Sequence, residues 1–505
     1  MTVIPFTGTP GPVHQLGENA TPRDFFHLFW EPSFFQLLAE ETNLYASQKQ
    51  AAKPNPRWYP TSAEEMMAFV GVNIIMGIDQ KPEMCNYWST DEYLGNEGVK
   101  KVFPRERFEA LTRYLHLNDS AKMPGREQPG YDPLFKVRPL IHLCSRTFLD
   151  HYTPAREMSV DEAMIRYKGR VFFRQYMPKK PIKWGIKVWT IADAKNGFVS
   201  NFDIYLGKAP PTDAAEHGLC TRVVLELSKP FYRSNRHLYF DNYFNSQVLA
   251  EELLKRDLYA CGTLNANRYP PPLKVGRSAI KLRPGEKMQL QKGNLLLTVW
   301  HDKRQVAVLS TNCQPNQTVE VQRRFKQPPY VKAVSIPAPV RQYNTYMGGV
   351  DLNDQFRSYY PSGRTGKKWW RYVFWFLLDV AICNAMVIEK LSPHAQTSRK
   401  RRALLQFKLQ LAKELIGGFS GRKRYPGQKR KSSSTNNAIG LPNLPGHAEV
   451  KFSGRKRVCM QCAKSGRKTP SGRTPETTFG CGRCGVNLCR NSCFLQYHTE
   501  NNYCM

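Results

Sequence analysis

Acidic residues at four positions have settings typical of metal-dependent catalysis. Asp161 and Asp241 each follow a short apolar stretch, and Asp351 follows a Gly-Gly turn, with Asp354 three residues later. Hard divalent cations such as Mg²⁺ and Mn²⁺ prefer oxygen ligands and keep several waters, so a few carboxylates are enough to hold them. Two such ions about 4 Å apart can activate an attacking water and stabilise the leaving 3′ oxygen in phosphoryl transfer. Spacing alone does not show that these acids form a metal site. Among 41 acidic residues many trios arise by chance, and an Asp after a strand is also a common turn former.

A second group of candidate ligands lies at the C-terminal end. Between residues 459 and 504 the chain has seven cysteines and one histidine: Cys459, Cys462, Cys481, Cys484, Cys489, Cys493, His498 and Cys504. Two Cys-x2-Cys pairs at this separation are typical of zinc sites, and eight ligands are enough for two tetrahedral Zn²⁺ ions. The start of the chain lacks the basic and apolar regions of a secretory signal, so we expect thiols rather than disulfides. The segment has few apolar residues, and bound metal would therefore supply most of its folding free energy.

The overall charge favours a polyanionic partner. The chain has 505 residues, 74 of them Lys or Arg and 41 Asp or Glu, which gives a net charge of +33 and a pI near 9.7. Nucleic acid is the first candidate and an anionic membrane surface the second. Hydrophobic residues make up 41% of the chain, which is enough for sizeable cores, and the length predicts two to four domains.

Basic and aromatic side chains in four segments are candidate DNA contacts. They are Lys179, Lys180, Lys183 and Lys187; Lys367, Lys368, Trp369, Trp370 and Arg371; Arg455, Lys456 and Arg457; and Arg467 and Lys468. The first lysines would neutralise backbone phosphates, or would protect a solvated edge strand. The two tryptophans would stack on unpaired bases, or would begin the core helix that follows them. Basic runs at residues 398–402 and 421–424 would contact phosphates, direct nuclear import or simply stay solvated.

The elements that position these residues alternate along the chain. Residues 22–135 are predicted to be mostly helical, with a helix start at Pro60-Thr61-Ser62. Strands are predicted over residues 184–192, 198–206 and 237–240, with a tight turn at Asn196-Gly197, and a helix over 221–227. A hairpin is predicted within 295–309, and helices return over 351–417. The most apolar stretch, 372–388, carries Asp379 and Asn384 and is short for a membrane span, so we expect a buried core helix and no membrane partner.

Seven sequence motifs together resemble the piggyBac family of DNA transposases. They are FFQLLAEETNLYA, FVGVNIIMGI, CNYWS, MSVDEAMIRYKGR, QYMPKKPIKWGIKVW, YFDNYFNS and YNTYMGGVDLNDQ, followed by a Trp-rich helix and a Cys-rich end. The similarity spans about residues 25–505. Several of its motifs are specific in combination, so a chance match is improbable.

The resemblance implies a multidomain α/β fold with a ribonuclease-H-like catalytic core. The core would be split by a β-rich insertion and flanked by helical segments for dimerisation and DNA binding, with a cross-brace zinc finger at the C-terminus. The expected boundaries are a disordered leader over 1–20, a helical domain over 21–156 and 361–420, the core over 157–262 and 341–360, the insertion over 263–340, a basic linker over 421–457 and the zinc domain over 458–505.

The resemblance also implies a DDD-type transposase. Asp161, Asp241 and Asp351 match the family's catalytic aspartates and would bind Mg²⁺, while Asp354 matches a further acid whose role is catalytic or structural. The implied reaction is cut-and-paste transposition: nicking at the terminal inverted repeats, hairpin formation and opening, and strand transfer into TTAA targets with seamless excision. A homodimer is expected because two transposon ends must be cut together.

Three expectations stay open at this point. By analogy with RING and PHD-like fingers, one zinc ion would be held by Cys459, Cys462, Cys489 and Cys493, and the other by Cys481, Cys484, His498 and Cys504. Family members often have a long acidic leader, and the start of this chain is not acidic. The rival functions are a domesticated DNA-binding protein without transposition, and a ubiquitin ligase or chromatin reader that uses the zinc module.

Overall fold

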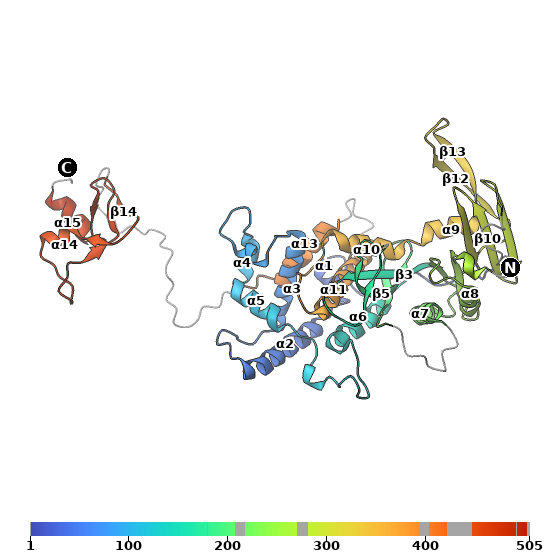
Figure 1. The fold of residues 1–505 in the computed structure, drawn as a ribbon, viewed down its shortest axis with the longest axis horizontal. Helices are drawn as coiled ribbons and strands as arrows, with labels where there is room; N and C mark the ends of the chain where they lie inside the picture. Colours follow the sequence, from blue (N-terminus) through green and yellow to red (C-terminus); the bar gives the residue numbers. More distant parts are fainter. Residues whose placement is uncertain are drawn as a thin grey trace. The chain divides into compact units, whose positions relative to one another are not determined.

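The computed structural model describes residues 2–178, 180–207, 218–269, 281–393, 403–421, 447–490 and 492–501. The chain divides into two compact units, Met1–Lys423 and Arg424–Met505, drawn in Figure 1. The division falls inside the segment predicted to be a basic linker.

Helices from both ends of the first unit pack together. The helices and 3-10 turns that precede the sheet are α1 (Pro22–His27), α2 (Pro32–Ala52), α3 (Ala63–Ile78), η1 (Met84–Trp88), α4 (Glu97–Val102), α5 (Arg105–Tyr114), η2 (Ser120–Lys122), η3 (Phe135–Val137) and α6 (Arg138–Asp150). After the sheet come α11 (Trp369–Leu391) and α13 (Leu404–Ile416), which pack against α1, and α13 also packs against α3. Ser62 caps α3 as predicted, because its Oγ accepts a hydrogen bond from the Glu65 amide at 3.2 Å.

A mixed sheet follows the first helices. Its antiparallel part consists of β4 (Arg174–Tyr176), β5 (Trp184–Asp193), β6 (Val199–Ile204) and β3 (Glu157–Arg166), and β3 pairs in parallel with β7 (His237–Phe240), which pairs in parallel with β8 (Tyr259–Thr263). α7 (Leu219–Ser228) and α8 (Gln247–Leu254) pack on one face with Trp189 and Met158, and the large helical core covers the other face at Ala163 and Val188. The predicted turn at Gly197 joins β5 to β6 with φ +75°. This sheet is the predicted ribonuclease-H-like α/β core.

The insertion between β8 and the return to the core is rich in strands, as predicted. β11 (Gln305–Ser310) pairs with β8, so that β10 (Leu295–His301) and β9 (Lys287–Lys292) extend the mixed sheet to nine strands. β12 (Thr318–Arg324) and β13 (Val331–Pro337) form a separate hairpin, and the short turns η4 (Lys229–Phe231) and η5 (Ala266–Arg268) lie in the loops before it. The chain then returns through α9 (Ala338–Tyr346) and α10 (Gly349–Tyr359).

The N-terminal leader is bound to the first unit, and the prediction of a disordered leader over 1–20 is wrong for the described residues. Gly11–Pro12 forms β1, which pairs with β2 (Tyr152–Thr153), and the Ile4 amide donates to the Tyr259 hydroxyl at 2.7 Å. The partners lie more than a hundred residues away along the chain. Composition shows only a short segment with little periodicity, and it contains no information about such distant partners.

Helix α11 is the predicted core helix. It is long and apolar enough to cross a membrane, but 83% of its most apolar window is buried inside the protein. The side chain of Asn384 bonds both backbone groups of Val199, accepting from its amide at 3.0 Å and donating to its carbonyl at 2.9 Å. The C-terminal half of α11 is therefore held against the start of strand β6.

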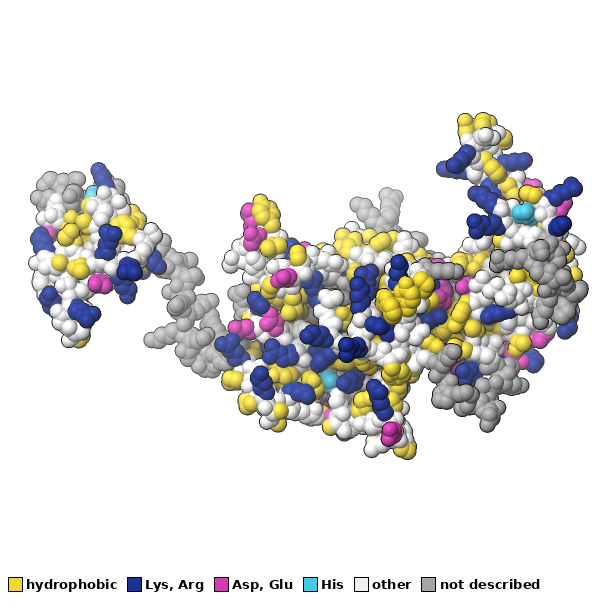
Figure 2. All heavy atoms as spheres, viewed as in Figure 1, with side chains coloured by type: hydrophobic (Ala, Val, Ile, Leu, Met, Phe, Trp, Pro, Cys, Tyr) yellow, Lys and Arg dark blue, Asp and Glu magenta, His cyan; other side chains and the backbone are white. Residues whose placement is uncertain are grey.

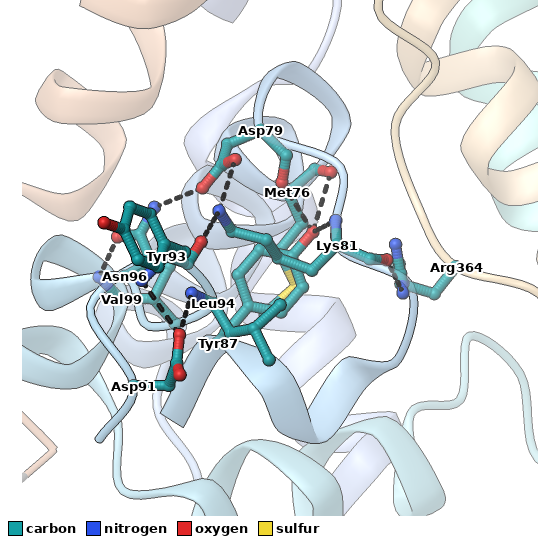
Figure 3. Close-up of polar contacts among 10 residues, drawn as sticks. All are labelled: Met76, Asp79, Lys81, Tyr87, Asp91, Tyr93, Leu94, Asn96, Val99 and Arg364. Atoms are coloured by element: carbon teal, nitrogen blue, oxygen red, sulfur yellow. Dashed lines mark hydrogen bonds and ion pairs between the residues drawn. The ribbon is translucent and has the colours of Figure 1, made fainter. Parts of the chain in front are cut away.

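A polar network holds the segment between α3 and α4 against the chain that follows α10, as Figure 3 shows. The Tyr87 hydroxyl donates to the Asp79 carbonyl at 2.7 Å, and Asn96 Nδ2 donates to the Asp79 carboxylate at 2.8 Å. Lys81 Nζ lies 3.1 Å from Asp79, while the Lys81 carbonyl accepts from Arg364 at 2.7 Å. The network thus connects the N-terminal helices to the residues just beyond α10.

A buried ion pair also holds the residues that follow α10. Lys408 Nζ, fully buried, lies 2.7 Å from Asp379 Oδ1 and donates to the Tyr360 carbonyl at 2.6 Å. Asp379 also accepts from the Ser362 amide at 2.9 Å and from its hydroxyl at 2.7 Å. Every partner of the pair is satisfied, and the pair joins α11 and α13 to the end of α10.

Removing one charge of this pair should destabilise the protein. We expect Asp379→Ala to lower the free energy of unfolding of the first unit by about 3–5 kcal/mol, because Lys408 would be left buried and unpaired. Urea denaturation monitored by tryptophan fluorescence measures the loss. The double variant Asp379→Leu/Lys408→Met should recover most of the stability, and a single variant as stable as wild type would contradict the assignment.

Candidate functional site

The register of the sheet places Asp161 beside Asp241. Strands β3 and β7 run parallel, and Val160 is paired with Phe240, so each acid is the next residue after that pair. Neighbouring strands lie about 4.8 Å apart. Burial raises the pKa of Tyr343, and the negative charges of Asp241 and Asp161 raise it further, so both carboxylates lie near this phenol on α9.

Glycines allow α10 to approach the sheet closely enough to bring Asp351 to the same place. A Cβ on Gly349 would lie 2.5 Å from Ser159 Oγ and 2.7 Å from the Asp193 carbonyl oxygen. The Val350 amide instead donates to Ser159 Oγ at 3.2 Å, two residues before Asp161 on β3. Burial raises the pKa of Asp351, as do the charges of Asp161 and Asp354, so the acids share one electrostatic field. Gly349 of the sequence motif is therefore required for contact with the sheet.

Lys180 supplies a positive charge to this acidic group. Its ammonium lies 3.6 Å from Asp161 Oδ2 and 3.7 Å from Glu162 Oε1. Burial lowers the pKa of Lys180, but the negative charges of Asp161, Glu162, Asp351 and Asp354 outweigh that effect and the pKa is raised. The acids thus hold a positively charged side chain of the protein itself.

Asp354 and Glu162 have surroundings that differ from those of the other acids. Asp354 is ion-paired with Arg357, whose guanidinium also donates to Asn353 Oδ1 at 3.1 Å and lies 4.3 Å from the Phe376 ring centroid. Glu162 is buried on the opposite face of β3 from Asp161, and burial together with the charge of Asp161 raises its pKa to about 7. Both residues contact protein groups that already restrain them.

The donor set at this site fits a hard divalent cation. Asp161, Asp241 and Asp351 offer only carboxylate oxygens, the ligands that Mg²⁺ and Mn²⁺ prefer. The carboxylate oxygens of these three acids are not all within 4.8 Å of one another. Among the described residues, groups of three or more potential ligands that meet this distance lie in the C-terminal unit. Like charges repel, and wider spacing is expected for carboxylates that are not bridged.

The structure separates the predicted phosphate-binding lysines into two groups. Lys183 is exposed, and Lys180 faces the acids. Lys187 is buried, with its ammonium 3.6 Å from the Trp189 ring centroid and 4.5 Å from that of Tyr243, so the prediction of a phosphate contact is wrong for this residue. Strand alternation turns it toward α7 and α8 instead of the surface. Lys179 lies outside the described residues.

The basic-aromatic segment before α11 is only partly available to a ligand. Lys367 is exposed, and Trp369 is half-buried with its ring edge-on to Phe173 at 5.2 Å. Trp370 is 2% exposed, so the prediction that it stacks on a base is wrong, and the alternative of a core position holds. Arg371 is half-buried and donates to the carbonyls of Thr112 and Arg113, so part of its guanidinium is already bound by the protein.

Cations nevertheless gather next to this segment. Burial and the charges of Arg371, Lys136 and Lys49 lower the pKa of Lys368 to about 8. The ammonium groups of Lys368 and Lys49 lie 5.0 and 5.4 Å from the ring centroid of Tyr45. A cluster of like positive charges is typical of an anion-binding surface.

His116, which packs edge-on against Trp370 at 5.5 Å, makes the fold sensitive to acid. Burial and the charges of Lys368 and Lys136 lower the pKa of His116 to about 4, below its usual 6.5. The unfolded chain therefore binds the proton more readily, and stability is lost as the pH falls from about 6.5 toward 4.

We expect His116→Gln to reduce that acid sensitivity. The stability difference between pH 7 and pH 4.5, measured by urea denaturation, should shrink by about 2 kcal/mol because the titrating group is gone. The exposed His142, replaced by Gln as a control, should leave the difference unchanged. An unchanged pH dependence in His116→Gln would refute the assignment.

The C-terminal unit gathers its ligands from short elements. They are β14 (Glu449–Lys451), β15 (Arg457–Val458), α14 (Met460–Lys464), β16 (Glu476–Thr477), β17 (Phe479–Cys481), β18 (Val486–Asn487) and α15 (Ser492–Glu500). β14 pairs with β17, so the unit includes residues before 458, and the predicted start of the zinc domain is too late.

Two tetrads of ligand atoms form in this unit. The first consists of Cys459, Cys462, Cys489 and Cys493, the set predicted for one ion, with Cys462 Sγ 3.5 Å from Cys493 Sγ and 4.0 Å from Cys489 Sγ. Sulfur atoms around a tetrahedral zinc lie about 3.8 Å apart, because each Zn–S bond is about 2.3 Å. The spacing and chemistry of this tetrad therefore fit a zinc ion.

The second tetrad differs from the predicted pairing by one member. It contains Cys481, Cys484, His498 and His447, with His447 Nδ1 3.4 Å from Cys481 Sγ and 3.3 Å from Cys484 Sγ. His498 Nδ1 donates to the Phe494 carbonyl at 2.7 Å, which leaves Nε2 for a metal, 3.6 Å from Cys484 Sγ. Cys504, the predicted fourth ligand, lies outside the described residues.

Sequence reasoning missed His447 because it lies upstream of the cysteine pairs, in the segment assigned to the linker. The only available signal was a lone histidine twelve residues before Cys459. The predicted DNA contacts of this unit, Arg455, Lys456, Arg457, Arg467 and Lys468, are all exposed.

Comparison with known proteins agrees with the fold and the motifs. The family model described as "Transposase IS4" matches residues 21–386. The human PiggyBac transposable element-derived protein 3 is 27% identical over 511 aligned residues, covering 99% of this chain and 80% of that protein. The human PiggyBac transposable element-derived protein 5 is 26% identical, covering 82% of this chain and 78% of that protein.

A solved structure extends the likeness to three dimensions. A piggyBac transposase, determined by cryo-electron microscopy as a synaptic complex with hairpin DNA, superposes with a TM-score of 0.70 at 25% identity, covering 96% of this chain and 100% of that one. The family match alone covers well over half of the sequence. The chain therefore belongs to the transposase family and, within it, to the piggyBac group.

Proposed function

We propose that the protein is a cut-and-paste DNA transposase that acts by metal-dependent phosphoryl transfer. The observation that carries the proposal is the convergence of Asp161 and Asp241, which follow a paired step of neighbouring parallel strands, with Asp351 brought alongside by the close approach of α10. Membership of the piggyBac group supports the same conclusion.

Asp161, Asp241 and Asp351 would hold Mg²⁺ or Mn²⁺. When bound, the ions lower the pKa of the attacking water or hydroxyl and neutralise charge on the leaving 3′ oxygen. Strands β3 and β7 fix the first two carboxylates rigidly, and the contact between Val350 and Ser159 fixes the third. Lys180 would pair with a substrate phosphate once a metal satisfies the acids, because its ammonium is already at the site.

The reaction has three stages in this proposal. Water attacks the phosphodiester at each transposon end, which breaks a P–O bond and releases a 3′ hydroxyl. That hydroxyl attacks a phosphodiester of the opposite strand, which forms the hairpin and releases the 3′ hydroxyl of the flanking DNA. A second water hydrolyses the hairpin phosphodiester and frees the 3′ hydroxyl of the transposon again. Each freed 3′ hydroxyl then attacks a phosphodiester at a TTAA target site, which joins the strands and releases a 3′ hydroxyl of the target. Every step breaks one P–O bond and forms another at a phosphodiester, so the same carboxylates would hold the metal ions for all of them.

Double-stranded DNA is the proposed partner, recognised at terminal inverted repeats and TTAA sites. The cations around Lys368 and the exposed basic residues of the C-terminal unit support this partner. Two structural Zn²⁺ ions would hold the C-terminal tetrads. A homodimer would bridge the two ends, and the place of action would be the nucleus, although the basic runs 398–402 and 422–424 lie outside the described residues.

Cleavage of a labelled duplex tests the proposal. The duplex carries the element's own terminal repeat next to TTAA, and the purified full-length protein is supplied with Mg²⁺ or with a chelator. We expect a nick followed by a hairpin, both dependent on Mg²⁺ or Mn²⁺. Specific binding of the repeat without cleavage under either ion would refute catalysis and favour a domesticated DNA-binding protein.

A further inference from the structure

The hairpin β12–β13 extends from the insertion and exposes much of its surface. Its strands pair from Thr318 with Pro337 out to Arg324 with Val331. One further backbone hydrogen bond, from the Phe325 amide to the Tyr330 carbonyl at 2.8 Å, continues the ladder into the tip. In Figure 1 the labelled hairpin lies beyond β10, at the end of the insertion.

On one face of the hairpin the side chains change from apolar at the base to basic and then aromatic at the tip. Paired residues in an antiparallel ladder share a face, and every second pair lies on the same one. On this face Val321 pairs with Val334 near the base, Arg323 pairs with Lys332 further out, and the tip carries an aromatic pair, Phe325 and Tyr330. The base packs against Trp300 and Val308, so the hairpin is anchored to the strands that extend the catalytic sheet.

The outer half of the hairpin is basic and aromatic. Residues 318–337 include four cations and one acid, Glu320. Arg323 is paired with Asp302 at 2.7 Å, but within the described residues Arg324, Lys326 and Lys332 form no ion pair and are exposed. Figure 2 shows Lys and Arg side chains along the hairpin and apolar side chains at its tip.

Two large rings at the tip are left in water. Phe325 is 46% exposed and Tyr330 is 64% exposed. Exposed aromatic rings next to unpaired cations are typical of surfaces that contact nucleic acid, because rings stack on bases or pack on sugars while cations contact phosphates. A two-stranded ribbon also fits the width of the DNA major groove.

We propose that β12–β13 is a DNA-binding arm that inserts into the groove of the duplex held at the catalytic acids. Arg324, Lys326 and Lys332 contact backbone phosphates, and Phe325 and Tyr330 pack against sugars and bases. This inference rests on the proposed function and adds the segment that grips the duplex. Val321 and Val334 at the base of the arm pack against Trp300 and Val308, which lie in the same sheet as the strand before Asp241. DNA bound by the arm is therefore held in a fixed relation to that acid.

Salt-dependent binding of the full-length protein to the fluorescently labelled end duplex tests the arm. Arg324→Ala/Lys326→Ala/Lys332→Ala should flatten the plot of log affinity against log salt by up to about 2.7, since each lost phosphate contact contributes about 0.9. Phe325→Ala/Tyr330→Ala should weaken binding on the order of tenfold or more without changing that slope. Matched controls are Tyr93→Ala, whose ring is 80% exposed elsewhere, and the exposed Lys53→Ala.

Three outcomes separate the alternatives. The inference would be overturned if both arm variants melt like the wild type and keep its DNA affinity and its salt dependence of binding. That result would not affect the proposed function, which the cleavage assay tests. Loss of self-association in Phe325→Ala/Tyr330→Ala, with DNA affinity unchanged, would show that a second copy covers the tip, and would also overturn it. A wild-type protein that binds through the arm but does not cleave would support the arm and refute the proposed function.

Discussion

Asp241→Asn is expected to abolish strand cleavage while the protein still folds and still binds the transposon end. The substitution keeps the shape of the side chain but removes a charge that a divalent ion requires. Loss of metal stabilisation of the leaving oxygen should cost about 4 kcal/mol or more in the transition state, which is at least about a thousandfold in rate. The measurement is single-turnover cleavage of the end duplex, beside binding and thermal melting of the same samples.

Substitutions of three other aspartates provide the comparison for this result. Asp161→Asn should behave like Asp241→Asn, because the two acids follow the same register pair. Asp354→Asn should lose less activity, since Asp354 is already paired with Arg357. Asp150→Asn is the matched control, because Asp150 is half-exposed and only 3.6 Å from Arg146 in a surface pair. Wild-type cleavage by Asp241→Asn would refute the assignment of the carboxylates.

Removal of zinc is expected to unfold the C-terminal unit and leave the first unit intact. The unit has a small core consisting mainly of the cysteines themselves with Leu488 and Phe494, so little apolar burial remains without the metal. Zinc in small structural sites contributes about 10–16 kcal/mol of apparent binding free energy, which exceeds the stability of most domains. Chelation should therefore make this part of the chain sensitive to protease, while the fragment up to about residue 423 survives.

Metal analysis of single variants distinguishes the ligand sets. The wild-type chain should bind two zinc ions, and Cys462→Ser should bind one. His447→Ala should also bind one, because His447 contributes to the second tetrad, whereas Cys504→Ala should retain both. The reverse pattern, with two ions in His447→Ala and one in Cys504→Ala, would restore the pairing expected from the sequence.

Local sequence signals predicted the elements well where packing and propensity agree. His237–Phe240 was predicted as a strand to the residue, because a short apolar run ends at turn-forming Asp and Asn. The turn at Gly197 and the cap at Ser62 follow from side-chain chemistry within a few residues. Analogy with RING and PHD-like fingers likewise predicted the first zinc tetrad, which consists of two local pairs, Cys459 with Cys462 and Cys489 with Cys493.

Features that depend on distant contacts could not be predicted in this way. The leader has no periodicity, yet its backbone pairs with Tyr152–Thr153. Trp370 looks like a stacking residue by composition, and only the fold buries it against His116. His447 joins the cysteines across the β14–β17 pairing, which no spacing rule anticipates. Lys187 alternates inward because β5 is covered on that face by α7 and α8.

The central claim, that the acids hold metal against the scissile phosphate, is tested most directly by a metal-rescue measurement. The end duplex is synthesised with sulfur in place of the leaving 3′ oxygen at the nick site, and cleavage by the wild-type protein is compared in Mg²⁺ and in Mn²⁺. Direct coordination predicts cleavage that is strongly impaired in Mg²⁺ and restored in Mn²⁺, which accepts sulfur more readily. Equal rates in the two ions would contradict the account, because no bound metal would then touch the leaving atom.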